Sequence, residues 1–504
     1  MAETKREIER KYESDESGLP DLTGVAGVAA VVDKGVAQLD ATYYDTADER
    51  LAGAAITLRR RTGGSDAGWH LKFPVAPGVR DEIQAPLSDT LPREIAALVR
   101  SRVRDTDLLP VVRLRSARDV RELTDGKGRL LAEVSVDAVT AERLTGDGGR
   151  AQWTEIEVEL ADGADPAVLD KVDKRLRKAG VRPSKSPSKL ARALTETAPK
   201  KARKHRRAAT RPAPPVTAGD HVLAYLREQR DTIVALDPAV RRDVYDSVHR
   251  MRVATRRTRS AFKSYGKLLD RAVTDPIGEE LKWLAGELGV DRDQEVLTER
   301  LTDALGALPR TLTAGPVRTR LRTWSHARRG GSRRRLIAVL DGRRYLALLG
   351  ALDALLAEPP LLKPAAGDPA KVISRAVRKD FDKLAVLVEQ ALELPPGHDR
   401  DFALHEARKK AKRARYAAEA AVPALGDPAG GLVKSMKSVQ SLLGDHQDSV
   451  MTREALRDLA QQAHSAGESA FTYGLLYGRE ERRAADVERE LPGVWAPIRA
   501  EVPV

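Results

Sequence analysis

The chain lacks cysteine, has few aromatic residues and contains no apolar run long enough to span a membrane. The absence of cysteine excludes disulfides and thiolate metal sites and indicates a reducing compartment, so we expect a cytoplasmic protein. Aromatic side chains are only 4% of the 504 residues, so the cores must rest on Leu, Val and Ala. The best apolar run, near residues 346–357, contains Asp353, which favours a buried helix. The first ten residues lack the apolar segment of a secretion signal.

Acidic residues are in the minority. The chain has 87 Lys and Arg against 74 Asp and Glu, a net charge of +13 and a pI near 9.7. Such a balance indicates a polyanionic partner, which could be nucleic acid, an acidic membrane surface or a phosphate polymer. A general bias toward arginine would give the same charge. The length exceeds what one core holds, so we expect more than one domain.

A basic, proline-punctuated stretch divides the chain. Residues 198–215 carry seven basic side chains and no acidic one, which is typical of a linker, whether a solvated tether or a segment that also contacts a polyanion. We therefore predict a first domain over residues 1–197, a linker over 198–218 and a second domain over 219–504. The second domain is predicted to hold two repeats, at about 219–360 and 361–504.

The two halves differ in their hydrophobic periodicity. Before the linker, short alternating runs predict strands, interrupted by a helix near 91–103 and another that starts at Asp165-Pro166 and ends at Gly180. After the linker, apolar residues recur at helical spacing almost to the end. The first half is therefore predicted as α+β and the second as all-α.

The predicted strands carry charge on one face, because alternate side chains of a strand share a side. Some strands present carboxylates and others present cations. An ordinary antiparallel sheet with one solvated face would explain any single strand, but not this division. If the sheet closes, the two kinds of strand face each other across a lumen suited to a metal–polyphosphate complex. The strands read EIERK from Glu7, ITLRRR with Arg59 and Arg61, WHLKF with His70 and Lys72, VVRLR with Arg113 and Arg115, LLAEVSVD with Glu133 and Asp137, and TEIEVEL with Glu155, Glu157 and Glu159.

The run Glu7-Ile8-Glu9-Arg10-Lys11 resembles the ExExK signature of the CYTH family of triphosphate tunnel metalloenzymes. The Arg-x-Arg strand, the Lys72 strand, the EIEVEL strand and the SKSPSK segment follow in the family's order, so the resemblance covers about residues 5–194. It implies a closed antiparallel β-barrel of eight strands around a tunnel, dependence on Mg²⁺ or Mn²⁺, and phosphoanhydride hydrolysis or cyclisation.

The resemblance also assigns roles to individual residues. It implies that Glu7, Glu9, Glu157 and Glu159 bind the metal, and that the first three of them are also the catalytic residues. His70 is expected to line the tunnel or the surface rather than to catalyse. The implied triphosphate-binding residues are Lys11, Arg59, Arg61, Lys72, Arg115, Arg118, Lys185 and Lys189, of which Arg118 depends on how its strand is registered.

The helical half repeats itself. VHRMRVATRRTRSAF has His249 where HEARKKAKRARYAAE has His405, an offset of 156 residues, and LGVDRD and LGDHQD place Gly289 and Gly444 at an offset of 155. Two matched pairs at nearly one offset indicate a tandem duplication. Each copy carries cations at three- and four-residue spacing on one helix face without an acidic partner, which costs stability. A solvated basic helix would explain one copy better than two.

These segments resemble the CHAD domain, named for its conserved histidine, from about residue 219 onward. The resemblance implies two related four-helix bundles around a basic groove that binds inorganic polyphosphate. Metal binding by the histidines is disfavoured by the neighbouring cations. The residues that it assigns to polyphosphate are His249, Arg252, Arg256, Arg257, Arg259, His405, Arg408, Lys409, Lys412, Arg413, Arg415 and His446.

Three functions are compatible with these patterns. One is a metal-dependent triphosphatase that processes polyphosphate or tripolyphosphate, with the helical domain gripping the polymer. Another is a non-catalytic polyphosphate-binding protein associated with polyphosphate granules. The last is nucleic-acid binding, which the missing base-stacking aromatics and motifs disfavour. The retained carboxylate strands favour the enzyme, because a simple binder does not need metal ligands. The sequence leaves the oligomeric state open.

Overall fold

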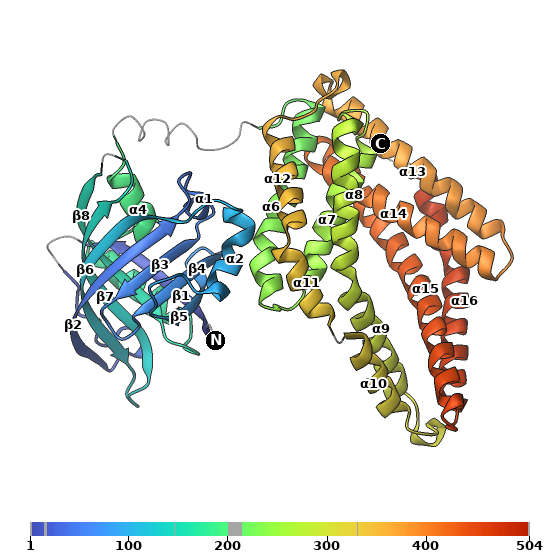
Figure 1. The fold of residues 1–504 in the computed structure, drawn as a ribbon, viewed down its shortest axis with the longest axis horizontal. Coiled ribbons are helices and arrows are strands. Elements are labelled where there is room, and N and C mark those ends of the chain that lie inside the picture. Colours follow the sequence, from blue (N-terminus) through green and yellow to red (C-terminus); the bar gives the residue numbers. More distant parts are fainter. Residues whose placement is uncertain (1–2, 15–17, 147, 200–213, 330, 502–504) are drawn as a thin grey trace. The chain divides into compact units, whose positions relative to one another are not determined.

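The computed structural model describes residues 3–14, 18–146, 148–199, 214–329 and 331–501, and the chain forms two compact units, 1–212 and 213–504 (Figure 1). Most of the predicted linker, residues 200–213, lies outside the described residues. The first unit is built on strands and the second on helices, as the change of periodicity predicts.

The strands of the first unit form a closed ring. Its sheet has the order β5-β4-β3-β2-β6-β7-β8-β1-β9, and β1 also pairs with β5, so eight antiparallel strands close on themselves. The short strand β9 pairs with Tyr12 and Glu13 of β1, beyond the residues that pair with β5. The strands are β1 (Glu3–Glu13), β2 (Ala30–Asp45), β3 (Thr57–Thr62), β4 (Gly68–Ala76), β5 (Val79–Pro86), β6 (Leu109–Thr124), β7 (Leu130–Arg143), β8 (Arg150–Leu160) and β9 (Arg182–Pro183).

Two helices cover apolar faces on the outside of this ring. α2 (Arg93–Val103) packs on the outward side chains of β3, β4 and β5, and α3 (Ala167–Lys178) packs on those of β7 and β8. Both helices were predicted from the sequence. The N-cap residue of α3 is Pro166, one position after the expected Asp165, whose side chain accepts a hydrogen bond from the Ala167 amide at 2.9 Å. The short helix α1 (Arg50–Gly53) joins the cluster under α2 through Leu51.

A further helix, α4 (Lys189–Glu196), closes one end of the ring's interior. Its side chains Leu190, Ala193 and Leu194 are buried against inward side chains of the strands, among them Trp153 and Tyr43. Ser188 caps the helix by accepting from the Ala191 amide at 3.1 Å. Because the apolar cluster fills this end, the charged part of the lumen opens toward the other end.

The second unit is all-helical. One main core unites both sequence repeats, and it consists largely of Leu, Val and Ala, as the composition predicts. The first repeat holds α6 (Ala218–Arg241), α7 (Ser247–Ser264), α8 (Arg271–Glu287), α9 (Gly289–Gly306), α10 (Val317–Arg329), α11 (Ser332–Asp341) and α12 (Arg343–Ala357), and the second holds α13 (Pro369–Glu393), α14 (His398–Leu425), α15 (Asp427–Ser465) and α16 (Phe471–Ala500).

The duplicated motifs occupy equivalent helices. The basic stripes lie on α7 and α14, which pack on each other, with the Tyr265 hydroxyl donating to the Ala417 carbonyl at 2.7 Å. Gly289 begins α9, directly after α8, whereas Gly444 lies inside the single helix α15. A second apolar cluster joins α9 and α10 to the far parts of α15 and α16, where Figure 1 shows them extending beyond the main bundle.

Within the described residues, we find no helix that combines the length and the apolar character needed to cross a membrane.

We predict that Leu194→Ala destabilises the first unit by about 2–5 kcal/mol, because it removes a fully buried side chain from the cluster that closes the ring. Leu130→Ala is the matched control, since Leu130 is 40% exposed on β7. Thermal unfolding of the full chain should show the transition of the first unit lowered for Leu194→Ala and unchanged for the control. Equal shifts for both variants would mean that α4 does not pack into the ring.

Candidate functional site

The interior of the ring holds a cavity of about 660 Å³ lined by charged side chains. We call it the tunnel cavity. It brings together all but two of the residues predicted for the first unit, from β1, β3, β4, β6, β8 and the start of α4. These are Glu7, Glu9, Lys11, Arg59, Arg61, Lys72, Arg118, Glu157, Glu159 and Lys189.

A row of carboxylates runs across four neighbouring strands of the tunnel wall. Glu9 on β1 lies opposite Glu159 on β8, Glu159 lies opposite Glu133 on β7, and Glu133 lies opposite Glu122 on β6. All four line the cavity. Like charges directly opposite each other destabilise a sheet, and burial together with Glu159 raises the pKa of Glu133. This row is therefore a site where a bound cation would relieve repulsion.

The wall formed by β3, β4 and β5 is mainly cationic. It contributes Arg59, Arg61, Lys72 and Arg80 to the same cavity, and β6 adds Arg118. Burial, and then Arg59 and Arg118, lower the pKa of Arg61 to about 9, because these cations lie close together. Such crowding of cations suits an anion with several negative oxygens.

Glu7 and Lys72 join the two walls. Lys72 Nζ donates to both carboxylate oxygens of Glu7 at 2.7 Å. Burial nevertheless raises the pKa of Glu7 to about 7, with Lys72 opposing the rise and Glu82 adding to it. A carboxyl group with this pKa can exchange a proton near neutral pH.

Lys189 sits among three buried carboxylates at the closed end of the cavity. Its Nζ lies 3.0 Å from Asp137, 2.8 Å from Glu155 and 2.6 Å from Glu157. Arg118 donates to both oxygens of Asp137 at 2.8 Å and to Glu157 at 2.9 Å. The three carboxylates are close enough to ligate one ion. Lys189 and Arg118 neutralise them here, so this end has the groups to hold either a cation among the carboxylates or a phosphate against Lys189.

The carboxylate row offers a further set of metal ligands. Carboxylate oxygens are the ligands that hard divalent cations prefer, and the row adjoins Glu7 on β1 and Glu157 on β8. The expected ligands Glu7, Glu9, Glu157 and Glu159 thus line one cavity and stay a prediction, to which the row adds Glu133 and Glu122. A cation there would face the basic wall across the cavity.

Two predicted phosphate ligands lie elsewhere. Arg115 is on the other face of β6, where its Nε lies 3.6 Å from Asp40 on the outside of the ring and its side chain is 60% exposed. Arg115 and Arg118 differ in parity, so a regular strand cannot turn both inward. Lys185 is exposed in the loop before α4 and does not line the tunnel cavity.

Arg80 and Glu82 also line the cavity, from β5, although neither was among the predicted site residues. Polar and other side chains alternate in the sequence VRDEIQ, so that Arg80, Glu82 and Gln84 share one face of the strand. This alternation is the signal by which the sequence identifies them. His70 is fully buried, with Nδ1 2.8 Å from Glu82 and Nε2 2.8 Å from the Asp66 carbonyl. Burial lowers the pKa of His70 to about 4, so it is a neutral residue that positions Glu82.

The second unit has its own cationic cluster where α7 and α14 meet. Burial, and then Arg408, Arg256 and Arg252, lower the pKa of Lys412 to about 7. This dependence places cations of both repeats around Lys412. Two cations of each stripe are therefore close enough to interact, and we call Arg252, Arg256, Arg408 and Lys412 the helical cationic cluster.

A glycine makes room for an arginine in each repeat. A Cβ built on Gly289 would lie 2.8 Å from the Arg252 guanidinium, and one on Gly444 would lie 3.4 Å from that of Arg408. The two duplicated glycines thus accommodate the two equivalent arginines. The side chains of residues 291–293, in the motif after Gly289, lie outside the described part of the chain.

Other predicted cations of the stripes are held by carboxylates or carbonyls. Arg413 lies 3.0 Å from Asp380 and donates to the Lys263 carbonyl at 2.7 Å, so it ties helices together. Arg257 and Arg415 both donate to Glu419, at 2.8 and 2.9 Å. Lys409 forms an ion pair with Glu406. Arg259 is a different case, because its helical spacing puts it on the same face of α7 as Arg252 and Arg256.

The three predicted histidines have different surroundings. His405 Nδ1 hydrogen-bonds to Gln447 at 2.5 Å, while His249 lines a pocket that also contains Glu295 and Glu299. His446 is buried, with Nε2 3.3 Å from both Asp401 and Glu488.

This buried trio has the donors of a metal site. Its carboxylates are already paired, because Arg453 lies 3.0 Å from Asp401 and Arg400 lies 2.9 Å from Glu488. His446 therefore belongs to a neutralised structural network, and the structure does not place it against the helical cationic cluster.

The first unit is a closed ring with acidic and basic walls, and the second is a duplicated helical bundle with a cationic cluster. Comparison with known protein families identifies both domains. The CYTH domain model matches residues 5–194 and the CHAD domain model matches residues 224–457. The chain belongs to the family of proteins that combine a CYTH and a CHAD domain. CYTH proteins are metal-dependent.

Two relatives extend over nearly the whole chain. The uncharacterized proteins MT2285 and Rv2226 of Mycobacterium tuberculosis are each 41% identical over 490 residues, which are 94% of this chain and 92% of theirs.

Solved structures resemble one domain at a time. PptA from Streptomyces chartreusis is 22% identical with a TM-score of 0.48 and covers 56% of this chain and 99% of its own. The CHAD domain from Ricinus communis is 25% identical with a TM-score of 0.44, covering 56% and 92%. HpAC1 from Hippeastrum, described as having a dominant triphosphatase activity, is 18% identical with a TM-score of 0.25, covering 38% and 98%.

We predict that Glu133→Gln stabilises the metal-free protein by about 0.2–1 kcal/mol, because it removes one of several opposed like charges. The same change should reduce the stabilisation that added Mg²⁺ or Mn²⁺ gives the wild type. Thermal unfolding with and without each ion measures both effects. Glu142→Gln, on the same strand but paired with Arg150 at 3.1 Å, is the control. If both variants respond to the ions as the wild type does, the carboxylate row is not the metal site.

Proposed function

We propose that the first unit is a metal-dependent phosphoanhydride hydrolase that acts on tripolyphosphate or the end of a polyphosphate chain. The observation that carries this proposal is the pairing of a carboxylate row with a cationic wall inside one closed cavity. A chain of phosphates coordinated to a divalent cation needs both signs of charge at once, and the two walls supply them.

The proposed reaction is hydrolysis of the terminal anhydride. Water attacks the terminal phosphorus, the bond from that phosphorus to the bridging oxygen breaks, and the electron pair goes to the oxygen of the remaining chain. The water proton goes to a carboxylate, so tripolyphosphate gives orthophosphate and diphosphate. When bound, Mg²⁺ or Mn²⁺ supplies charge that neutralises the phosphate oxygens.

The chain's own residues bind and orient the substrate. Arg59, Arg61 and Lys72 face the carboxylate row and would contact the phosphate oxygens, as would Arg80 and Arg118. Glu7 is placed to accept the water proton, because its pKa of about 7 allows it to be ionised near neutral pH. The predicted catalytic residues Glu9 and Glu157 would share in holding the cation.

For the second unit we propose polyphosphate binding at the helical cationic cluster. Cations of two repeats converge there, and an extended polyanion can contact both. The substrate in both units would then be the same chemical class. In a cell, such a protein would be cytoplasmic and associate with polyphosphate granules. We expect nucleic acid to compete poorly, because a duplex is too wide for a site between two helices.

A non-catalytic polyphosphate-binding protein is the alternative function. Lys72 and Lys189 hold several of the carboxylates in ion pairs, and an inactive binder would keep such pairs when phosphate binds. The row Glu9–Glu159–Glu133–Glu122 favours the enzyme, because a protein that only binds phosphate needs cations and not a line of metal-ligating carboxylates.

We predict release of orthophosphate from tripolyphosphate by the full chain in the presence of Mg²⁺ or Mn²⁺. Glu9→Gln and Glu159→Gln should each lower kcat by at least 100-fold, because each removes a carboxylate from the cation site. A phosphate-release assay with tripolyphosphate, long polyphosphate, ATP and thiamine triphosphate measures this, with and without metal.

Arg115→Ala is the matched control, since Arg115 lies outside the ring, and its kcat should equal that of the wild type. Absence of phosphate release from every substrate tested would refute the hydrolase and leave the binding protein as the function.

We predict that Gly289→Ala weakens binding of long-chain polyphosphate by about tenfold or more. The added methyl group would displace the Arg252 guanidinium, at the cost of about one charge-assisted contact. Gly286→Ala is the control, because nothing lies within 4 Å of its Cβ. Equilibrium binding to the full chain, in EDTA, measures both variants, and competing DNA should displace polyphosphate poorly.

Binding should also weaken as the pH rises through 7, because Lys412 loses its proton near that pH and a neutral amine attracts the polyanion less. Lys412→Gln should flatten this dependence between pH 6 and 8. A pH profile equal to that of the wild type would remove Lys412 from the site.

A further inference from the structure

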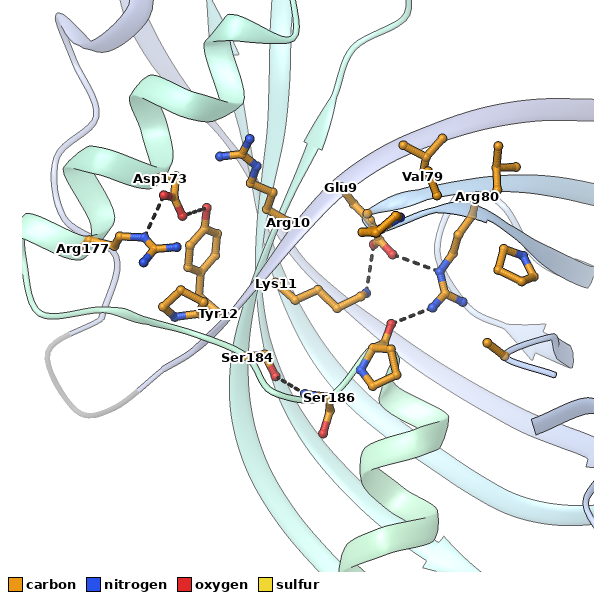
Figure 2. Close-up of a pocket in the computed structure, with 18 residues that line it drawn as sticks. Glu9, Arg10, Lys11, Tyr12, Val79, Arg80, Asp173, Arg177, Ser184 and Ser186 are labelled. Atoms are coloured by element: carbon orange, nitrogen blue, oxygen red, sulfur yellow. Dashed lines mark hydrogen bonds and ion pairs between the residues drawn. The ribbon is translucent and has the colours of Figure 1, made fainter. Parts of the chain in front are cut away.

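A second cavity, of about 620 Å³, lies in the first unit beside the tunnel cavity. We call it the lateral pocket (Figure 2). The β4–β5 turn, the loop after β9, α3 and the second half of β1 surround it. Its lining residues include Arg10, Tyr12, Val79, Asp173, Ser184 and Ser186.

The pocket exists because one side of β1 is paired discontinuously. β5 pairs with β1 only as far as Ile8 opposite Val79, after which the Glu9 amide donates to the Gly78 carbonyl at 2.9 Å. β9 resumes the pairing at Tyr12, and the Ser184 amide donates to the Lys11 carbonyl at 2.9 Å, so the interruption is confined to the stretch between Glu9 and Lys11. The lateral pocket lies between the β4–β5 turn and the loop after β9, where the ladder is interrupted.

Three charged residues line both cavities, namely Glu9, Lys11 and Arg80. Arg80 donates to the Pro187 carbonyl at 2.6 Å and lies 3.7 Å from Glu9, while Lys11 Nζ donates to Glu9 at 2.9 Å. Figure 2 shows these side chains meeting at one end of the pocket. Flexible side chains shared by two cavities can connect them by changing rotamer, which strand backbone cannot do.

The tunnel cavity needs such a connection if it hydrolyses phosphate chains, on which this inference rests. α4 closes one end, and Lys189 stands there beside the Glu157 that also binds Lys11. A chain that enters from the open end places its terminal phosphate at the closed end. After cleavage, the orthophosphate is trapped behind the remaining chain unless it leaves sideways.

The charges of the lateral pocket suit a small anion. Four cations, Lys11, Arg80, Arg10 and Arg177, line it with two carboxylates, Glu9 and Asp173. The carboxylate of Asp173 is occupied, because it accepts from the Tyr12 hydroxyl at 3.0 Å and from Arg177 at 2.7 Å. Arg177 is thereby paired, and Arg10 is paired with Asp170 outside the pocket, so Lys11 and Arg80, beside Glu9, are the cations that an anion would meet next to the tunnel.

We propose that the lateral pocket is a binding site for orthophosphate and its route out of the tunnel cavity, with Arg80 and Lys11 passing the anion from one cavity to the other. The tunnel can then stay filled by the remaining chain while the product leaves. This path would favour repeated cleavage of a long chain without its release.

The test uses the full chain in EDTA, with the tunnel saturated by tripolyphosphate, and measures binding of radiolabelled inorganic phosphate by equilibrium dialysis. The wild type should still bind phosphate. Ser186→Trp, which fills the lateral pocket, should weaken phosphate binding at least tenfold. Leu130→Trp, at an exposed position of β7, should leave it unchanged. Phosphate held by the second unit is common to all three proteins and cancels in the comparison.

Ala76→Trp, at an exposed position of the same pocket, replaces Ser186→Trp if that variant fails to bind tripolyphosphate as the wild type does. Two results would overturn the proposal. One is that a pocket-filling variant that still binds tripolyphosphate binds phosphate as tightly as the wild type does. The other is that tripolyphosphate displaces all of the bound phosphate from the wild type.

A kinetic arm with Mg²⁺ separates the exit route from the hydrolase itself. In a chemical-quench experiment, Ser186→Trp should give a burst of one phosphate per enzyme followed by a slower steady state, because cleavage is intact and release is blocked. A steady state equal to that of Leu130→Trp would refute the route. If no protein cleaves tripolyphosphate, the hydrolase fails, and the dialysis result alone decides whether the pocket binds phosphate.

Discussion

Repulsion among carboxylates that face one lumen is the constraint on which the first unit depends. Closing eight strands into a ring turns Glu9, Glu159, Glu133 and Glu122 into one row inside the lumen, where Glu9 is buried and the other three are partly exposed. The ring tolerates this row because cations surround it, such as Lys5 at 2.6 Å from Glu159. The same requirement for positive charge makes the lumen a place where a divalent cation and a phosphate chain can replace the resident pairs.

In the second unit, the like charges that lie close together are positive. Its helical cationic cluster crowds like charges of positive sign between α7 and α14, and Lys412 responds by a pKa of about 7. Each unit therefore places like charges close together, as a carboxylate row in the first and as a cationic cluster in the second. A phosphate polymer with its counter-cations suits both, which gives a physical reason for the two domains to occur in one chain.

The closed end of the ring links the fold to its proposed chemistry. α4 fills that end with Leu190 and Leu194, while Lys189 at its start faces the carboxylates. A dead-end cavity holds a chain terminus in a fixed place, but it also obstructs the product. The interrupted pairing of β1 offers a way around this obstruction, because it leaves the side chains of Lys11 and Arg80 between two cavities.

The sequence determined the two fold classes, the tandem duplication and most of the charged face of the tunnel, because strand alternation and helix periodicity are local properties. It could not decide Arg115 against Arg118, since parity is meaningful only once the register of β6 is known, and Arg115 lies outside the ring beside Asp40. Nor could it separate Arg413, tied to Asp380, from the converging Arg256, or place His446 against two carboxylates. Those distinctions depend on which helices pack together, and only the tertiary structure sets long-range contacts of that kind.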